Sequence, residues 1–187
     1  QHAHTMRIGK HGSERGYGAY KKEMKKMGMD CLLSVGNGSA QESKLISMNY
    51  QGGKKGDKPY AIVGKGITFD TGGISLKPPP TMDEMKFDMC GSAIVFGTMS
   101  AVAELRPKKN IVAIVPSTHN MLGGSAYLPG DILTAYNGKT IEILNTDAEG
   151  RLILADALSY ASKHYDPEFM VDFATLTGAC VVTFGHI

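Results

Sequence analysis

Four loop segments at predicted strand ends concentrate the acidic residues and lysines with most potential for chemistry. They are VGKGITFDTGG at 63–73, ISLK at 74–77, the stretch around Asp88, and NTDAEGRL at 145–152. In an open α/β sheet, ligands bind at such strand ends. Carboxylates that converge in a small pocket repel one another strongly, and divalent cations would compensate their charge. Metal-assisted chemistry is therefore the first hypothesis.

Each of these segments taken alone also has a simpler structural interpretation. A lysine that follows a strand, as Lys65 does, is usually a solvent-exposed strand end. An aspartate near a helix start, such as Asp88, interacts favourably with the helix dipole. Asp147 and Glu149 could form a negatively charged helix start, with Arg151 as an incidental ion-pair partner. Only the combination of segments favours a functional site over these alternatives.

The elements that must position these segments alternate between strands and helices. The predicted strands are 44–50, 60–65, 110–116, 131–136, 140–144 and 169–176. The predicted helices are 20–27, 87–105 and 152–164. Residues 1–17 show no clear period and are predicted to be irregular, and the Gly/Pro-rich residues 66–82 are predicted to form a loop.

Turn residues and apolar runs indicate how these elements assemble. Asn137-Gly138 is the strongest short hairpin signal, and the Gly/Lys turn at 51–58 predicts a second hairpin from the strands on either side of it. The continuous apolar run in 110–116 is typical of a strand covered on both faces. The sequence therefore predicts an α/β fold, in which a mixed central β-sheet has helices on both faces in three layers, α/β/α.

Composition excludes several classes of protein. The chain has 187 residues, 42% of them hydrophobic and 20% charged, and its net charge of +2 disfavours nucleic acid as a partner. Cys31, Cys90 and Cys180 lie far apart, which fits a reducing, cytoplasmic location rather than a disulfide framework. No apolar stretch is long enough for a membrane span. Both ends, Gln1 and Ile187, look cut, so we expect a piece of a longer protein.

Together the segments resemble the signature blocks of the leucyl aminopeptidase (cytosol aminopeptidase) family. NTDAEGRL is an eight-residue match to that family's diagnostic motif, and 63–73 and 75–77 match further blocks. The likeness continues through PGD, NGKT and ATLTGA and runs from about Cys31 to Gly178. It implies an aminopeptidase/phosphorylase-hydrolase-like catalytic domain over 31–187, incomplete at its C-terminus. The first thirty residues match the family poorly, and residues 1–30 are predicted from their own pattern to form an irregular and entry-helix segment.

The resemblance also implies a site for two divalent metal ions. Its ligands would be Lys65, Asp70, Asp88, Asp147 and Glu149. Asp70 and Glu149 would bridge the ions, Lys65 and Asp88 would complete one site, and Asp147 the other. Oxygen ligands with one nitrogen and no thiolate suit zinc, manganese or magnesium. Lys65 could ligate only as a neutral amine, which burial and an adjacent dication favour.

The reaction implied by the resemblance is the release of N-terminal, leucine-like residues from peptides. Hydroxide held between two ions about 3.5–4 Å apart would attack the peptide carbonyl. Lys77 would stabilise the oxyanion, and Arg151, which stays protonated, would hold a bicarbonate ion that shuttles the proton. Thr175 and Leu176 are expected to line the substrate site. The family also implies a homohexamer.

Two functions from other classes stay open. A truncated relative could keep the scaffold as a catalytically inactive interaction protein. Metal content, together with hydrolysis of a leucine chromogenic amide, would distinguish this protein from an active aminopeptidase. A DNA-binding role is known for some bacterial relatives of the family. The near-neutral charge and the absence of a basic stripe disfavour it here, and a salt-dependent gel shift would test it.

Overall fold

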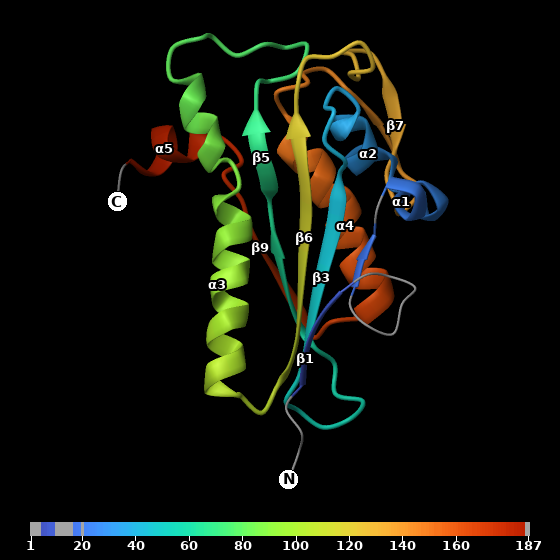
Figure 1. The fold of residues 1–187 in the computed structure, drawn as a ribbon, viewed down its shortest axis with the longest axis vertical. Coiled ribbons are helices and arrows are strands. Elements are labelled where there is room, and N and C mark those ends of the chain that lie inside the picture. Colours follow the sequence, from blue (N-terminus) through green and yellow to red (C-terminus); the bar gives the residue numbers. More distant parts are fainter. Residues whose placement is uncertain (1–4, 10–16, 20, 186–187) are drawn as a thin grey trace.

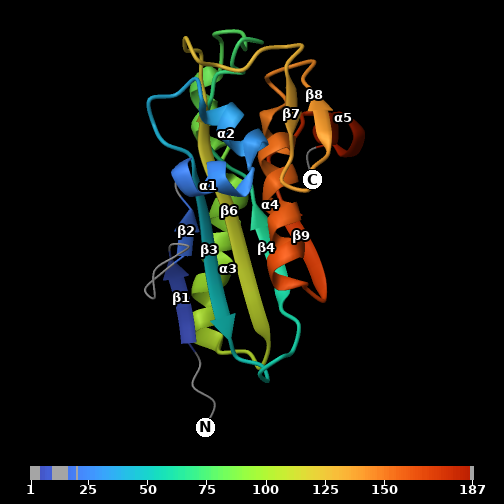
Figure 2. The ribbon, with the colours of Figure 1, turned by 90° about the vertical axis from the view of Figure 1, so that its right-hand side faces the viewer.

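The computed structural model describes residues 5–9, 17–19 and 21–185, and its centre is a seven-stranded mixed sheet. The strand order is β1-β2-β3-β6-β4-β9, and β5 continues along the edge of β6 beyond β4 (Figures 1 and 2). β4, β5 and β9 run parallel to their partners, whereas β3 is antiparallel to β6. The strands of this sheet are β1 (Thr5–Gly9), β2 (Tyr17–Ala19), β3 (Lys44–Gln51), β4 (Tyr60–Gly64), β5 (Gly66–Asp70), β6 (Asn110–Asn120) and β9 (Phe169–Phe173).

Helices cover both faces of this sheet, as the sequence predicts. Figure 1 shows α3 on one side of the strands and α4 with α2 on the other, and the predicted α/β/α layering is confirmed. A small hairpin of β7 (Ile132–Thr134) and β8 (Thr140–Glu142) forms a separate sheet. The helices are α1 (Lys21–Met27), α2 (Asp30–Gly36), a 3₁₀ helix (Met82–Phe87), α3 (Cys90–Leu105), α4 (Glu149–Tyr165) and α5 (Ala179–Phe184).

Strand β6 divides the hydrophobic core into two parts. Val112 and Ile114 pack with α2 and α4 on one face, and Ala113 and Val115 pack with α3 on the other. Successive side chains of a strand point to opposite faces, so a continuous apolar run is required where both faces are covered. This confirms the prediction for 110–116, although the strand extends four residues further, to Asn120.

A buried carboxylate fastens α2 and the β7–β8 hairpin to α4. Asp156 on α4 is fully buried, and its two oxygens accept hydrogen bonds from the backbone N–H of Leu32 and of Tyr136, both at 2.8 Å. Burial is the main cause that raises the pKa of Asp156 to about 6. The side chain thereby satisfies an N–H in the first turn of α2 that has no partner within the helix.

Glycines at the contact between α3 and the sheet, Gly64 and Gly91, allow the helix to approach the strands closely. A Cβ at Gly91 would lie 2.1 Å from the carbonyl oxygen of Phe173, and a Cβ at Gly64 would lie 2.6 Å from the carbonyl oxygen of Gly91. Both obstacles are backbone atoms, which cannot rotate away as a flexible side chain can. The small residues at the start of α3 are therefore a packing requirement.

Replacing Gly91 by alanine is expected to destabilise the protein by more than about 2 kcal/mol, toward the upper end of the range for overpacking. Gly97 on the same helix is the matched control, because a Cβ there meets nothing within 4 Å. Gly97→Ala should stabilise the protein by up to about 1 kcal/mol through helix propensity. Urea unfolding followed by circular dichroism measures both changes. Equal stability of the two variants would contradict the close contact.

The structure differs from several sequence-based predictions. The hairpin predicted around 51–58 is wrong, because β6 lies between β3 and β4. Within the predicted loop 66–82, residues 66–70 form β5, and residues 5–9 and 17 are strand rather than irregular. Of the predicted helix 87–105, Phe87 belongs to the 3₁₀ helix, residues 88 and 89 form a turn, and α3 begins at Cys90.

Two shorter corrections concern the second half of the chain. Helix α4 begins at Glu149, three residues before its predicted start. Strand β9 ends at Phe173, three residues before the predicted end at 176, and its Phe169 and Val171 are 47% and 41% exposed. The hairpin around Asn137-Gly138 is confirmed. Among the described residues, no helix combines the length and apolar character needed to cross a membrane.

Candidate metal centre

The predicted site residues come together at the carboxyl ends of the parallel strands. Lys65 follows β4, Asp70 is the last residue of β5, and Thr175 follows β9. Glu149 is the first residue of α4, and Asp88 lies two residues before α3. Parallel strands end at one edge of a sheet, so residues far apart in the sequence meet there.

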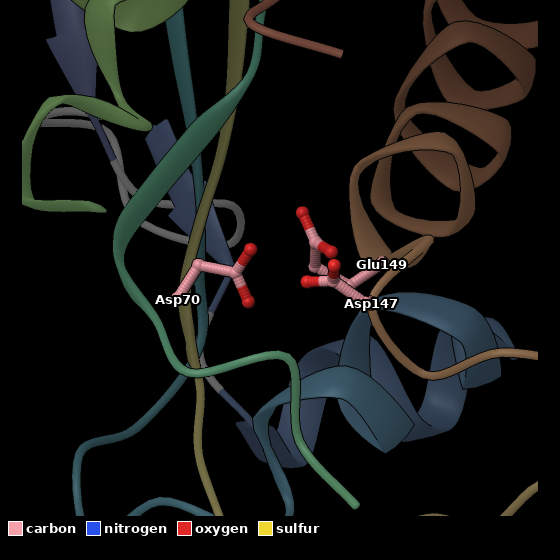
Figure 3. Close-up of side chains that lie close together, drawn as sticks. All are labelled: Asp70, Asp147 and Glu149. Carbon is pink, nitrogen blue, oxygen red and sulfur yellow. The ribbon is translucent and has the colours of Figure 1, made fainter. Parts of the chain in front are cut away.

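Three carboxylates form the centre of this cluster. One oxygen each from Asp70, Asp147 and Glu149 lie within 4.8 Å of one another. Figure 3 shows Asp70 projecting from β5 toward Asp147 and Glu149, which project from the start of α4. Asp70 and Glu149 are buried, and Asp147 is half-buried. Three oxygen ligands at this spacing could hold a metal ion.

Lys65 connects this centre to the fourth carboxylate. Its ammonium nitrogen lies 2.8 Å from Asp88 Oδ1 and 2.9 Å from Glu149 Oε1, and it donates a hydrogen bond to the Thr175 carbonyl at 2.8 Å. The residue is 3% exposed. Gly150 in the first turn of α4 leaves room for this side chain, since a Cβ there would lie 2.8 Å from the Lys65 Nζ.

Lys77 forms the second cationic link, on the solvent side of the cluster. Its ammonium group pairs with Asp70 Oδ2 at 3.0 Å and with Asp147 Oδ1. Burial lowers the pKa of Lys77, but hydrogen bonds to Asp147 and Asp70 outweigh burial and raise the pKa above its ordinary value. Lys77 therefore carries a positive charge at neutral pH.

The loop after β5 aims Lys77 at the carboxylates. Gly72 and Gly73 have φ angles of +87° and +64°, and a Cβ at Gly72 would lie 2.5 Å from the Ser75 carbonyl oxygen. The reversal brings the N–H of Lys77 within 2.9 Å of the Thr71 carbonyl oxygen. Only glycine adopts this left-handed conformation at low cost.

A buried threonine joins this loop to the segment that carries Asp147. The Thr146 hydroxyl donates to the Gly72 carbonyl at 2.6 Å and accepts from the Ser75 N–H at 2.8 Å. The Thr146 N–H donates in turn to the Ser75 hydroxyl at 3.1 Å. These bonds fix Lys77 and Asp147, which come from distant parts of the chain, in one rigid unit.

The charges of the cluster do not balance within the chain. Four carboxylates face two ammonium groups, so with all four ionised two negative charges would be uncompensated. Burial first and the charge of Asp70 next raise the pKa of Glu149 to about 7, against the opposing effect of Lys65. Burial likewise is the main cause of the raised pKa of Asp88. The cluster therefore favours additional positive charge.

Unpartnered oxygen atoms show where that positive charge fits. Asp88 Oδ2 and Glu149 Oε2 are buried and have no hydrogen-bond partner among the described residues. Leaving a buried polar atom unpaired is costly, more so for a charged one. Carboxylate oxygens and one amine, without a thiolate, suit divalent zinc, manganese or magnesium. The donor set thus fits the metal ions that the sequence predicts.

The remaining predicted site residues lie around the cluster in different ways. The Thr175 hydroxyl donates to Asp88 Oδ1 at 2.6 Å, so its side chain supports a predicted ligand. Leu176 is 41% exposed beside it. Arg151 is exposed in the first turn of α4, and it makes no ion pair with any described residue.

Sequence reasoning missed two buried polar residues of the site, Asn120 and Thr146. Both are fully buried, and Asn120 donates a hydrogen bond to Asp70 Oδ1 at 2.8 Å. Thr146 stands inside NTDAEGRL, where a polar residue before two acids gives no sign that it is buried. Asn120 lies four residues beyond the predicted end of its strand, so its position at the end of β6 became visible only in the structure.

The chain is similar in sequence to known proteins. The family profile "Cytosol aminopeptidase family, catalytic domain" matches residues 11–187. A probable cytosol aminopeptidase of Nitrosomonas europaea is 60% identical over 167 residues, which are 89% of this chain and 33% of that protein. Proteins of the same name from Cenarchaeum symbiosum and Pseudomonas syringae pv. tomato are 60% and 61% identical over 89% and 88% of the chain.

The chain spans about a third of the length of these curated relatives. The family match covers nearly all of the described residues, including every residue of the carboxylate and lysine cluster. The chain therefore belongs to the cytosol aminopeptidase family, whose catalytic domain it matches.

Proposed function

We propose that this chain is the catalytic part of a two-metal aminopeptidase that releases N-terminal, leucine-like residues from peptides. The observation that carries the proposal is the buried cluster of four carboxylates at converging strand ends, with uncompensated charge and unpartnered oxygens. The names of the relatives support the same activity for the proteins of which this chain would form a part.

The residues that would hold the ions are those at the centre of the cluster. Asp70 and Glu149 would contact both ions, Lys65 and Asp88 would complete one site, and Asp147 the other. Divalent ions bound there would lower the pKa of a water molecule and polarise a peptide carbonyl. The free α-amine of a peptide would also bind at the cluster, which would restrict cleavage to the N-terminal residue.

The chain's own side chains would bind and orient the substrate around that centre. Lys77 is held protonated beside the cluster and would donate a hydrogen bond to the oxygen that becomes negative. Thr175 and Leu176 would form a wall for the substrate next to Asp88. Arg151, exposed on the first turn of α4, would hold a bicarbonate ion that accepts and returns a proton.

For the full-length protein we propose the assembly and location that the family implies. It would act on peptide substrates as a homohexamer in the cytoplasm, and residues 31–187 would constitute its catalytic domain.

Hydrolysis of a leucine chromogenic amide tests the proposed activity. The metal-saturated protein should release the chromophore, and removal of metal by a chelator should abolish the release until Zn²⁺ or Mn²⁺ is restored. The N-acetylated form of the same amide is the matched control and should not be cleaved, because it lacks the free amine. Cleavage that persists without metal, or equal cleavage of both amides, would refute the proposal. Metal binding without cleavage would favour the inactive-scaffold alternative.

A further inference from the structure

Asn120 occupies the last position of β6, and its side chain contacts the carboxylate cluster. The residue is 0% exposed. Its side-chain nitrogen donates to Asp70 Oδ1 at 2.8 Å and to the Thr146 carbonyl at 3.0 Å. A primary amide has two N–H groups, so both are used. One side chain thus bonds to Asp70 and to the residue that precedes Asp147.

The backbone of Asn120 is held as firmly as its side chain. Its carbonyl oxygen accepts hydrogen bonds from the Thr71 N–H at 2.9 Å and from the Thr71 hydroxyl at 3.0 Å. Thr71 directly follows Asp70, so the Asp70 carboxylate and the backbone that follows it are both bonded to the same residue of β6. Because the side chain and the backbone of Asn120 are both held, its hydrogen bond to Asp70 can set the direction of the Asp70 side chain.

The contacts of Asp70 show what that direction is. Its Oδ1 accepts from Asn120 Nδ2 and also from the Gly72 N–H at 2.9 Å. A carboxylate oxygen has about two lone-pair positions, so these two donors fill Oδ1. The other oxygen, Oδ2, faces the cluster, where Lys77 lies 3.0 Å away.

We propose that Asn120 is a positioning residue that selects Oδ2 of Asp70 as the oxygen presented to the metal ions. Through Thr146 it also sets how far Asp70 stands from the segment that carries Asp147. Aspartate could not replace it, because a carboxylate lacks the donors and would add a fifth negative charge. This inference rests on the proposed metal site and goes beyond it by adding a residue that does not ligate.

Manganese binding measured on two Asn120 variants tests the inference. Asn120→Ala removes both donors, and Asn120→Ser keeps a small polar group that is too short to reach Asp70. Each should bind Mn²⁺ about 10- to 100-fold more weakly than the wild type, as loss of the groups that orient metal ligands usually does. The electron paramagnetic resonance signal of free Mn²⁺ during titration gives the affinity without any assay of activity.

Tyr127→Phe is the matched control, because the Tyr127 hydroxyl donates to the same Thr146 carbonyl at 2.7 Å but has no contact with Asp70 among the bonds of the described residues. It should change the Mn²⁺ affinity less than about 2-fold. Wild-type affinity in Asn120→Ser would overturn the inference, and so would an equal loss in Tyr127→Phe, which would place the effect in the Thr146 segment. A wild-type protein that takes up no Mn²⁺ would instead refute the proposed function, and the inference with it.

Discussion

Glu149→Gln is expected to abolish metal binding and hydrolysis together, with a loss of more than about 100-fold in Mn²⁺ affinity. The substitution keeps the size of the side chain but removes its charge and replaces one oxygen by an NH₂ group that cannot ligate. Glu149 is 1% exposed, and its Oε2 has no hydrogen-bond partner among the described residues. Isothermal titration with Mn²⁺ and the rate of leucine amide hydrolysis measure the two losses.

The stability of the metal-free protein separates a ligand from a structural residue. Burial raises the pKa of Glu149 to about 7, which means that the fold favours the uncharged form. Neutral glutamine should therefore leave the melting temperature of the metal-free protein unchanged or higher, while the stabilisation by added metal disappears. Glu142→Gln, the same change at an exposed position of β8, should leave both affinity and activity intact. Wild-type Mn²⁺ affinity in Glu149→Gln would show that this residue is no ligand.

Lys77→Ala is expected to keep the bound metal but slow turnover by about 100- to 1,000-fold, the usual cost of losing one oxyanion partner. Lys77 is 21% exposed, its backbone is fixed by the glycine turn, and its pKa is raised so that it stays charged. The loss should therefore fall on kcat and leave KM nearly unchanged. Steady-state kinetics with metal analysis on the same sample measures both quantities.

Lys86→Ala provides the control for the loss of a lysine from the neighbouring segment. Its ammonium group lies over the exposed Phe87 ring at 5.1 Å from the ring centre, and it makes no ion pair with any described carboxylate. This variant should turn over at the wild-type rate. Full activity of Lys77→Ala would show that Lys77 does not stabilise the oxyanion. Loss of metal from Lys77→Ala, to the extent seen in Glu149→Gln, would show instead that Lys77 serves to hold Asp70 and Asp147.

The composition of the cluster could be predicted because its residues stand in short motifs. NTDAEGRL contains Asp147 and Glu149 within three positions, just before and at the start of α4. Lys65 and Asp70 lie similarly close along the chain. The structure brings these residues together with Asp88, although their roles as ligands remain predictions.

The order of the strands could not be read from local sequence, because it depends on pairing between distant segments. Tyr60–Gly64 pairs with β6 and not with its neighbour β3, and the Gly/Lys turn at 51–58 gives no sign of that. Gly66–Asp70 forms a strand although glycines flank it, because β6 extends to Asn120 and offers an edge. Local propensity gives way to tertiary pairing in both cases.

Asn120 and Thr146, the buried polar residues that hold the site in place, could not be predicted for a different reason. Asn120 and Thr146 are polar residues at the ends of local patterns, where the simplest interpretation is a solvated loop. Only the fold shows that both residues are fully buried. It also shows that the Asn120 side chain donates a hydrogen bond to Asp70 and that the Thr146 hydroxyl donates one to the Gly72 carbonyl. A buried polar residue must find partners, and these partners become visible only in three dimensions.

Anomalous diffraction from crystals grown with Mn²⁺ tests the central proposal most directly. The account predicts two anomalous peaks between β5 and the start of α4, the first near Lys65 and Asp88 and the second near Asp147, with Asp70 and Glu149 beside both. A cluster that stays without any peak at saturating Mn²⁺, or ions that bind only at other residues, would contradict it.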